Sequence, residues 1–474
     1  MKKKLTDTRL YQLLTTLSKR DHNAFEQFLQ SPYFNQRQDL IVLYQVLRPA
    51  VLQEEAPDYL TIWQQLSADK PYNDQQFRLL MSYLSKMVEQ FLAIETVRSQ
   101  PFDMKMATAD SLRSKGADKL AGTLLEEAKR QLNKQPYRHA NYWLRAYQHQ
   151  AALYREVYTQ RPEKNEGFAT FSKVLDHAFL AMKLRQNMAR INHQQVYEWN
   201  HQASGLDTYV EALDETQLPD EPAHRLYYYG SRLLQQPDNE QAFQKFKTLL
   251  FTNSSLFPEE EAFELYNLAI NFGIRQINHG KRSYFHDLIE LYKQGLQQGY
   301  LLRKGVLSRF TYHNVVSVAL QIDEQDWAVQ FLEEWTPKLE RRYRERMYNF
   351  NRAKIAYASQ QYDEALPLLQ QANYHDTLLN LGARTLLLKI YYELGEWDVL
   401  LSHLDAFQNY LRRKPELTTN HRTNYRNLIR FTRKLLKVEL RQTKQLQQLQ
   451  EQINKAAVLT EKEWLLRQLR LDYK

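Results

Sequence analysis

The sequence lacks cysteine, is poor in glycine and proline, and has no long hydrophobic run. Without cysteine, its 474 residues form no disulfide bond, no thiolate metal site and no thiol nucleophile. The 12 glycines and 14 prolines are too few for sheets and loop-rich enzymes, so the composition favours helices joined by short turns. No apolar run approaches the roughly 18–20 residues that cross a bilayer, and we expect no membrane span.

The N-terminal stretch MKKKLTDTRLYQLL is basic and then apolar, in the order that a secretory signal has. Polar residues at positions 6–9 interrupt it, and Lys19, Arg20 and Asp21 follow soon after. Such a short and polar segment does not act as a secretory signal. Together with the missing cysteines, this pattern predicts a cytoplasmic protein.

Motifs of catalysis are missing as well. The sequence has no glycine-rich phosphate loop, no HExxH and no GxSxG. Its 13 histidines are scattered, and no carboxylate–histidine cluster with ligand spacing surrounds His193 and His201. We therefore expect a protein that is not an enzyme, with no catalytic residue, no cofactor and no metal site.

Helical periodicity runs through the chain, and the predicted fold class is all-α. Residues 1–102 are predicted to form an N-terminal helical bundle, closed by a long helix that Asn73 caps. Residues 103–415 alternate helices of roughly 15–22 residues with brief breakers, a spacing typical of stacked helical hairpins. Residues 416–474 are predicted to form a basic helical cap, whose last helix starts with a capping box at 460–463.

An internal repeat of 35 residues is the clearest signal, and it is best defined over residues 314–408. It aligns Gln325, Gln360 and Gly395 at a turn between two helices. Five further columns keep apolar or aromatic residues in all three units, namely Trp327/Tyr362/Trp397, Phe331/Leu366/Leu401, Val318/Ala353/Leu388, Leu320/Ile355/Ile390 and Ile322/Tyr357/Tyr392.

The middle unit, AKIAYASQQYDEALPLLQQA, resembles the tetratricopeptide repeat, a helix–turn–helix of about 34 residues. Its small, aromatic, small, large and small packing positions are matched by Ala353, Tyr362, Ala365, Leu369 and Ala372. The third unit supplies the family's glycine before its aromatic residue, but it has Leu400 where the family has alanine. The first unit departs further, with Gln330 and Glu334.

This resemblance implies a right-handed array of helical hairpins whose concave surface holds a peptide or a helix of another protein. It assigns a packing role in the repeat to Trp327, Tyr362, Ala365, Gly395 and Trp397. Trp397 is expected to fold back between its own two helices. The N-terminal stretches FEQFLQSPYFN and YNDQQFRLLMSYLSKMVEQFL also resemble those of large bacterial helical proteins, a likeness that brings no function with it.

The positive charge is concentrated near the C-terminus. Residues 411–474 hold 16 Lys and Arg against 6 Asp and Glu, whereas the other 410 residues hold 48 against 49. No glycine or proline follows Pro415, so the segment is predicted to form one long basic helix or two that bend. One stripe of this helix carries seven cations at three- and four-residue steps, namely Arg422, Arg426, Arg430, Arg433, Lys437, Arg441 and Lys444.

Two interpretations of this stripe are open. It is either the solvated face of a capping helix or a surface that binds nucleic acid, an acidic protein or a membrane. Three hypotheses of function follow. The first is a non-enzymatic scaffold that binds a partner peptide or helix on the concave face. The alternatives are nucleic-acid or polyanion binding through the basic helix, and a peptide-sensing regulator. The sequence leaves the oligomeric state open.

Overall fold

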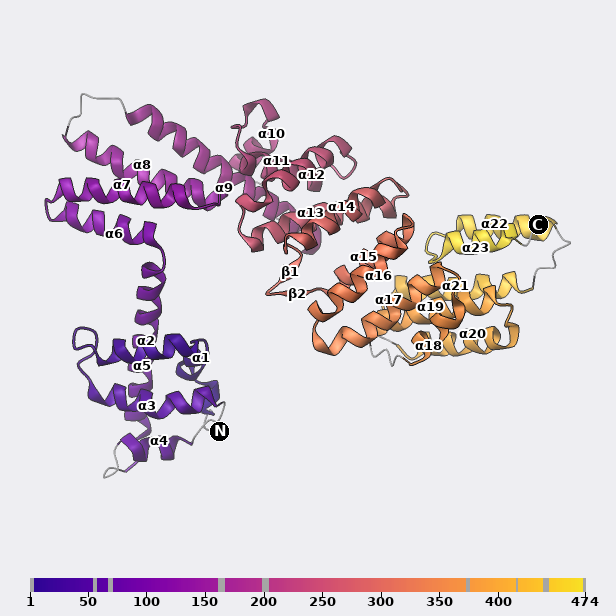
Figure 1. Ribbon diagram of the computed structural model, residues 1–474, viewed down its shortest axis with the longest axis horizontal. Helices are drawn as coiled ribbons and strands as arrows, with labels where there is room; N and C mark the ends of the chain where they lie inside the picture. Colours follow the sequence, from indigo (N-terminus) through magenta and orange to yellow (C-terminus); the bar gives the residue numbers. More distant parts are fainter. Residues whose placement is uncertain are drawn as a thin grey trace. The chain divides into compact units, whose positions relative to one another are not determined.

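The computed structural model describes residues 4–53, 58–66, 71–160, 167–197, 204–371, 376–414, 417–437 and 443–471, and there the chain is almost entirely helical (Figure 1). The predicted all-α class is confirmed. The only strands in these ranges are β1 (Leu302–Arg303) and β2 (Val306–Leu307), a short antiparallel hairpin that pairs Leu302 with Leu307. Lys304 and Gly305, at its turn, both have a positive φ.

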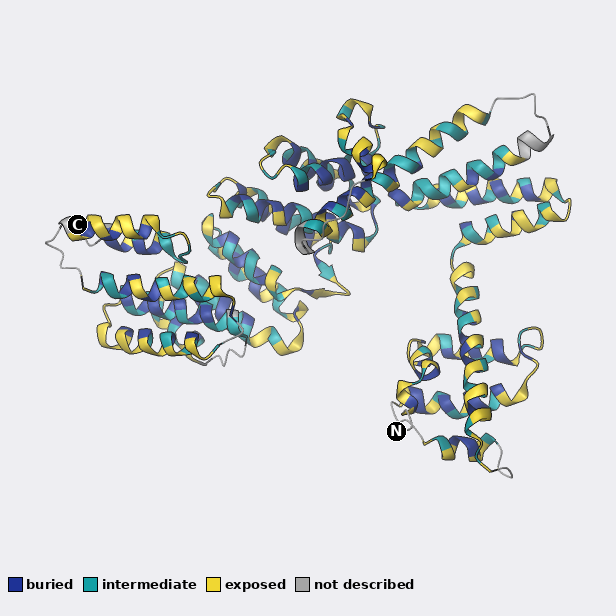
Figure 2. Cartoon of the chain, turned by 180° about the vertical axis from the view of Figure 1, so that it is seen from behind, coloured by how far each residue is buried: buried dark blue, intermediate teal, exposed yellow. Residues whose placement is uncertain are grey.

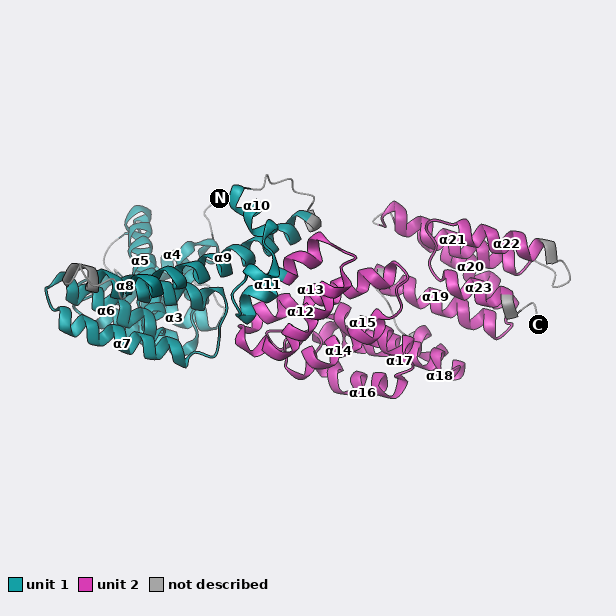
Figure 3. Cartoon of the chain, turned by 90° about the horizontal axis from the view of Figure 1, so that it is seen from above, with its two compact units in different colours: residues 1–228 teal, residues 229–474 magenta. Residues whose placement is uncertain are grey.

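The chain divides into two compact units, residues 1–228 and 229–474, and the division falls inside α11 (Pro222–Gln235) (Figure 3). The modules predicted from the sequence, with limits at 102/103 and 415/416, stay predictions. In each unit the buried residues follow one side of most helices, as amphipathic packing requires (Figure 2).

Unit 1 begins with a bundle around a single apolar core. Its centre includes Phe25, Leu43, Tyr44 and Phe91, all 2% exposed or less. The helices of unit 1 before α11 are α1 (Arg9–Thr15), α2 (Lys19–Gln30), α3 (Gln38–Leu52), α4 (Tyr59–Leu66), α5 (Asp74–Arg98), α6 (Pro101–Ser114), α7 (Asp118–Lys134), α8 (Ala140–Gln160), α9 (Phe168–Tyr197) and α10 (Gly205–Ala212), with 3₁₀ turns η1 (Leu5–Asp7) and η3 (Glu215–Gln217).

Small residues bring the next helices of unit 1 close together. Consecutive helices from α6 to α9 pack against each other. Ala109 of α6, Ala121 of α7 and Ala152 of α8 lie in one buried cluster with Leu125. Side chains of this size let helix backbones approach each other, as in packed helical hairpins.

Unit 2 continues with helical hairpins and ends in a compact C-terminal group. Its helices after α11 are α12 (Glu240–Asn253), α13 (Glu259–Asn278), α14 (Tyr284–Gln297), α15 (Arg309–Gln321), α16 (Gln325–Trp335), α17 (Arg344–Ala358), α18 (Tyr362–Gln371), α19 (Thr377–Glu393), α20 (Trp397–Arg412), α21 (Thr419–Leu435), α22 (Thr443–Lys455) and α23 (Lys462–Leu471), with 3₁₀ turns η4 (Ser254–Leu256), η5 (Thr336–Lys338) and η6 (Arg341–Tyr343).

The residues of the predicted repeat lie in three helix pairs, α15–α16, α17–α18 and α19–α20. The first helices pack in succession, α15 on α17 and α17 on α19. The hairpin turns contain one left-handed residue each, at Asp323 (φ 57°), Gln360 (φ 58°) and Gly395 (φ 73°). Gln325, which the sequence aligned with Gln360 and Gly395, is instead the first residue of α16.

The first repeat is therefore displaced by two residues from the predicted alignment. With this correction, Ala328, Ala365 and Leu400 become equivalent, and each is fully buried. Leu332, Leu369 and Leu404 form the next equivalent set, 3% exposed or less. The same face of each second helix is therefore buried against the first helix of its hairpin. The turns at Asp323, Gln360 and Gly395 are not evenly spaced along the sequence.

Candidate binding groove

A groove runs along the first helices of the three hairpins in unit 2. It consists of two hollows of about 610 and 560 Å³. His313 of α15, Phe350 of α17, Gly382 of α19 and Tyr425 of α21 line both hollows, so the two are continuous. We call the two together the repeat groove.

Equivalent positions of the three first helices line the repeat groove. Once the first repeat is shifted by two residues, Phe310, Met347 and Gly382 form one such set. The next turns carry His313/Phe350/Thr385 and then Ser317/Lys354/Lys389, and every one of these residues lines the groove. One stripe of each helix therefore faces the hollow, as a three- and four-residue spacing dictates.

Gly382 lets α17 and α19 approach each other at the middle of the groove. A Cβ atom at this position would lie 2.8 Å from Cζ of Phe350, closer than packed atoms come. The Phe350 ring is 5% exposed and belongs to the buried cluster of this repeat. The glycine thus fixes where the Phe350 ring can sit in the groove wall.

We expect Gly382→Ala to lower the free energy of unfolding by about 1 kcal/mol, because displacement of the Phe350 ring outweighs the gain in helix propensity. Urea denaturation measures the change. In a Phe350→Leu background the clash is relieved, and the same substitution should become stabilising. Stabilisation by Gly382→Ala in the wild-type background would contradict this account of the close approach.

One end of the repeat groove is apolar and aromatic. Phe310, at the start of α15, is 60% exposed, and Met347 and Leu379 line the hollow beside it. The Arg309 guanidinium lies 4.8 Å from the Phe310 ring centroid and 2.9 Å from the Asp376 carboxylate. Arg309 therefore keeps its charge paired while its side chain forms part of this aromatic wall.

The other end carries cations. Nζ of Lys354 donates a 2.7 Å hydrogen bond to Oγ of Ser317. The pKa of Lys354 is lowered to about 8, chiefly by burial, with Glu461 opposing the shift and the nearby Lys389 adding to it. Lys354 forms no salt bridge with any residue that the structure describes. Lys354 is half-buried, so its charge is held in a partly desolvated position, and no described carboxylate contacts it.

Lys389 occupies the equivalent position one repeat later and is paired. Its Nζ lies 2.9 Å from the Glu461 carboxylate and 4.6 Å from the centroid of the Tyr357 ring. Glu461 has a left-handed φ of 56° and immediately precedes α23. The predicted capping box at 460–463 is therefore replaced by a turn that directs Glu461 toward the groove.

Glu393 connects the wall of the groove to the C-terminal helices. Its carboxylate accepts hydrogen bonds from the hydroxyl groups of Tyr357 (2.6 Å) and Tyr362 (2.7 Å) and from Nε1 of Trp464 (2.7 Å). Burial, and then the Glu393 carboxylate, raises the pKa of Tyr362 to about 12. One acidic side chain thus ties α17, α18 and α23 to α19.

His313 is neutral at physiological pH. Burial lowers its pKa to about 3, and its Nδ1 lies 3.0 Å from Oδ1 of Asn351. No group of three or more His, Asp or Glu side chains with metal-binding spacing occurs in the described ranges. His313 therefore lines the groove as a polar, uncharged wall residue.

The predicted basic stripe lies mainly on α21. Arg426, Arg430, Arg433 and Lys437 line a separate hollow of about 420 Å³ together with Lys434, Ile429 and Gln408. We call this hollow the cationic groove. None of its described lining residues also lines the repeat groove.

Of the other three members of the predicted stripe, only Arg422 is fully described, and it is not among the residues that line the cationic groove. Arg422 donates hydrogen bonds to the backbone oxygens of Lys414 (3.1 Å) and Leu417 (3.4 Å), at the start of α21. Arg441 lies outside the described residues, and so does the side chain of Lys444.

Of the two predicted alternatives for the basic segment, one long helix or two that bend, the single helix is not what the structure has, and a separate last helix follows as expected. α21 ends at Leu435, and α22 and α23 follow. Leu446, Leu449, Trp464 and Leu465 of the last two helices are 4% exposed or less and share one buried cluster with residues of α20 and α21. A straight helix would leave these side chains in water, so burial of apolar surface favours the turn.

The residues with a predicted packing role differ in burial. Ala365 is fully buried, whereas Trp327 and Tyr362 are half-buried. Gly395 forms the expected left-handed turn. Trp397 departs from the expectation, because its side chain is 49% exposed and touches Tyr392 edge-on at a centroid distance of 5.5 Å. It covers the turn and does not fill the space between its two helices.

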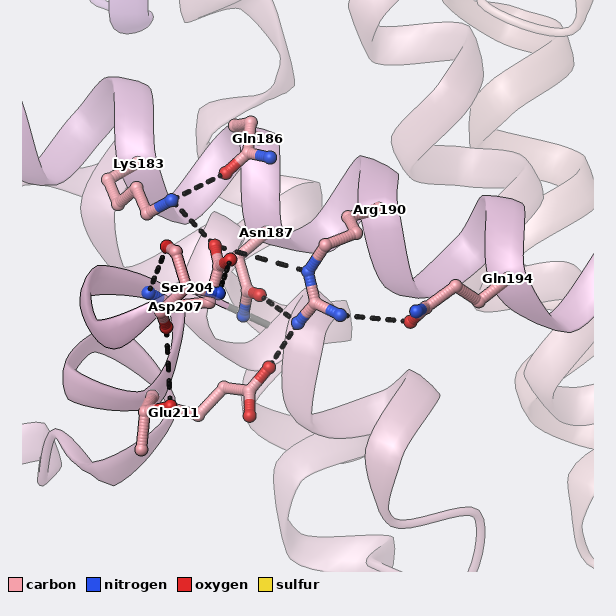
Figure 4. A network of polar contacts seen from close by, with 9 residues as sticks. Lys183, Gln186, Asn187, Arg190, Gln194, Ser204, Asp207 and Glu211 are labelled. Carbon is pink, nitrogen blue, oxygen red and sulfur yellow. Dashed lines mark hydrogen bonds and ion pairs between the residues drawn. The ribbon is translucent and has the colours of Figure 1, made fainter. Parts of the chain in front are cut away.

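Unit 1 contains a different polar cluster, between α9 and α10 (Figure 4). The Asp207 carboxylate lies 2.6 Å from Nζ of Lys183 and accepts a 2.7 Å hydrogen bond from the backbone N–H of Ser204. Arg190 contacts Glu211 and donates to Oδ1 of Asn187. Every charge in this cluster meets an opposite charge, so it attaches α10 to α9 and offers no free ligand position.

Asp207→Asn should destabilise unit 1 by about 2 kcal/mol at pH 7. Burial raises the pKa of Asp207, but hydrogen bonds from Lys183 and Ser204 outweigh it and lower the pKa to about 2. The stabilisation is therefore present above pH 4 and is lost as the pH falls from about 4 to about 2. Urea denaturation across this range should show the loss in the wild type and not in the variant. Asp220→Asn, at a 92% exposed side chain, should behave as the wild type does.

Comparison of the chain with protein families, curated proteins and solved structures finds no match. Among the described helices, none is long and apolar enough to cross a membrane.

Proposed function

We propose that this chain is a non-enzymatic scaffold that holds a segment of a partner protein in the repeat groove. The observation that carries the proposal is the continuous hollow along α15, α17 and α19, lined by equivalent positions of three successive hairpins. Arrays of helical hairpins use such faces to bind peptides and helices. The array that we infer resembles tetratricopeptide repeats in this respect.

The chemistry of the groove specifies the kind of segment. Phe310, Met347 and Leu379 offer an apolar surface at one end, where a bound side chain would be desolvated. Lys354 at the other end presents a cation that no described carboxylate contacts, and Arg467 lies nearby on the lining. A segment with an apolar anchor followed by an acidic residue would satisfy both ends. A peptide-sensing regulator would use the same surface.

Selection of peptides from a displayed library on the full chain tests this function. Selected peptides should share an apolar and an acidic position. Phe310→Ala should weaken their binding roughly 10–100-fold, because an exposed aromatic anchor of this kind contributes about 2 kcal/mol. Trp397→Ala removes another exposed aromatic side chain, outside the groove, and should leave the affinity unchanged. A library that yields no binder, or binders that tolerate Phe310→Ala, would contradict the proposal.

A further inference from the structure

The cationic groove between α20 and α21 is a second charged surface, and it carries an inference independent of the repeat groove. Its lining includes Arg426, Arg430, Arg433, Lys434 and Lys437. From Arg426 to Arg433 the helix rises by about 10 Å, with at least one cation per turn, and Lys437 extends the row two residues beyond the end of α21. Such a row suits an extended anion whose charges repeat regularly, and it exceeds what a single small ion neutralises.

Few negative groups compensate this row. In the described part of the chain, the one carboxylate that forms a salt bridge with it is Asp405, which contacts Arg433. Lys434 donates a 2.5 Å hydrogen bond to the amide oxygen of Gln452. Arg426, Arg430 and Lys437 are exposed. A solvated face usually mixes both signs of charge, so this surface favours an anionic partner.

The lining also identifies the class of anion. Among the described lining residues the only apolar one is Ile429, which is 3% exposed, and Leu428, Phe431 and Leu435 of α21 are buried in the core. The described part of this lining therefore offers no exposed apolar anchor for a protein interface or for insertion into a membrane. No aromatic ring is among the lining residues that the structure describes, so bases of a single strand have no stacking partner there.

We propose that the cationic groove binds the phosphate backbone of double-stranded nucleic acid without reading its sequence. About three exposed cations would contact phosphates, and Arg433 would exchange its contact with Asp405 for a fourth. Binding of this kind depends on the release of counterions. The affinity should therefore fall roughly 40-fold between 50 and 200 mM salt with three phosphate contacts and roughly 150-fold with four, with little difference between duplexes of different sequence.

The test measures binding of the full chain to a short fluorescent DNA duplex by anisotropy over this salt range. The triple variant Arg426→Ala, Arg430→Ala, Lys437→Ala should lose the binding and most of the salt dependence. A matched control removes three exposed cations of α7, Lys119, Lys129 and Arg130, and should bind as the wild type does. Circular dichroism verifies that each variant is folded.

Asp405→Asn provides a test in the opposite direction. It removes the carboxylate that competes for Arg433, so duplex affinity should rise a few-fold. No binding at 50 mM salt, equal loss in the α7 control, or no gain with Asp405→Asn would overturn the proposal. Tighter binding to polyglutamate or to anionic vesicles than to the duplex would overturn it as well, because the partner would then be an acidic protein or a membrane.

Discussion

The chain with Lys354→Met should be more stable than the wild type at pH 7, by about 2 kcal/mol. Burial lowers the pKa of Lys354 from 10.5 to about 8, so the folded state at pH 7 carries a charge that the surroundings disfavour. Methionine has a similar length and needs no hydration. Ser317 keeps a partner without the lysine, since its hydroxyl also donates to the backbone oxygen of His313 at 2.8 Å.

The effect should depend on pH in a defined direction. Between pH 8 and about 10.5 the unfolded chain binds the proton of Lys354 more tightly than the folded chain does, so wild-type stability gains with rising pH. The difference between the two chains should therefore shrink toward zero near pH 10. Urea denaturation at pH 7 and pH 10 measures it.

Lys389→Met is the matched control for this prediction. It removes the equivalent lysine one repeat later, which pairs with Glu461 at 2.9 Å. Its loss leaves Glu461 without that pair, so the variant should be no more stable than the wild type. If Lys354→Met also failed to stabilise the chain, Lys354 would not be the desolvated cation that we describe.

The second large effect is expected for Glu393→Ala, which should lower the free energy of unfolding of unit 2 by about 3 kcal/mol. The substitution removes the acceptor of four hydrogen bonds at once, three short ones from Tyr357, Tyr362 and Trp464 and a longer one of 3.3 Å from Nε2 of Gln468. Trp464 is 3% exposed, so water could not replace the carboxylate as the hydrogen-bond acceptor of its N–H. Urea denaturation followed by tryptophan fluorescence measures the loss.

Two further variants separate the hydrogen bonds from the loss of side-chain volume and charge. Glu393→Gln keeps an acceptor oxygen and should lose only about 1 kcal/mol. Glu396→Ala removes an exposed carboxylate three residues later and should change nothing. Equal losses for Glu393→Ala and Glu396→Ala would show that Glu393 does not connect the helices.

The sequence predicted the all-α class and the hairpin pattern because both depend on local periodicity. The register of the first repeat was wrong by two residues for an identifiable reason. Its left-handed turn residue is Asp323, whereas the third repeat uses Gly395. An aspartate does not mark a turn in the way a glycine does, and the aromatic residues Trp327 and Tyr362 then suggested a false equivalence.

The C-terminal turn could not be predicted for a different reason. Residues 416–474 contain neither glycine nor proline, so no local signal ends α21 at Leu435. The chain turns because Leu446, Leu449 and Trp464 bury themselves against distant residues of α20 and α21. Tertiary burial of this kind overrides helix propensity and is invisible to a local pattern.

The two charged surfaces were unequally visible in the sequence. The row from Arg426 to Lys437 follows helical spacing and was identified directly. The repeat groove was not, although Lys354 and Lys389 are one repeat period apart. Comparison of polar residues between repeats, in addition to apolar ones, would have placed both lysines on the same helix face.

Binding of a selected peptide to the Lys354→Met chain tests the central claim most directly. We expect its affinity to fall at least 10-fold at pH 7 while the free energy of unfolding rises, because a desolvated cation kept at a cost to stability serves a ligand. Isothermal titration calorimetry measures the affinity, and Lys338→Met, at an exposed site outside the groove, is the control. Unchanged or tighter peptide binding by the stabilised chain would contradict the assignment of the repeat groove as the binding site.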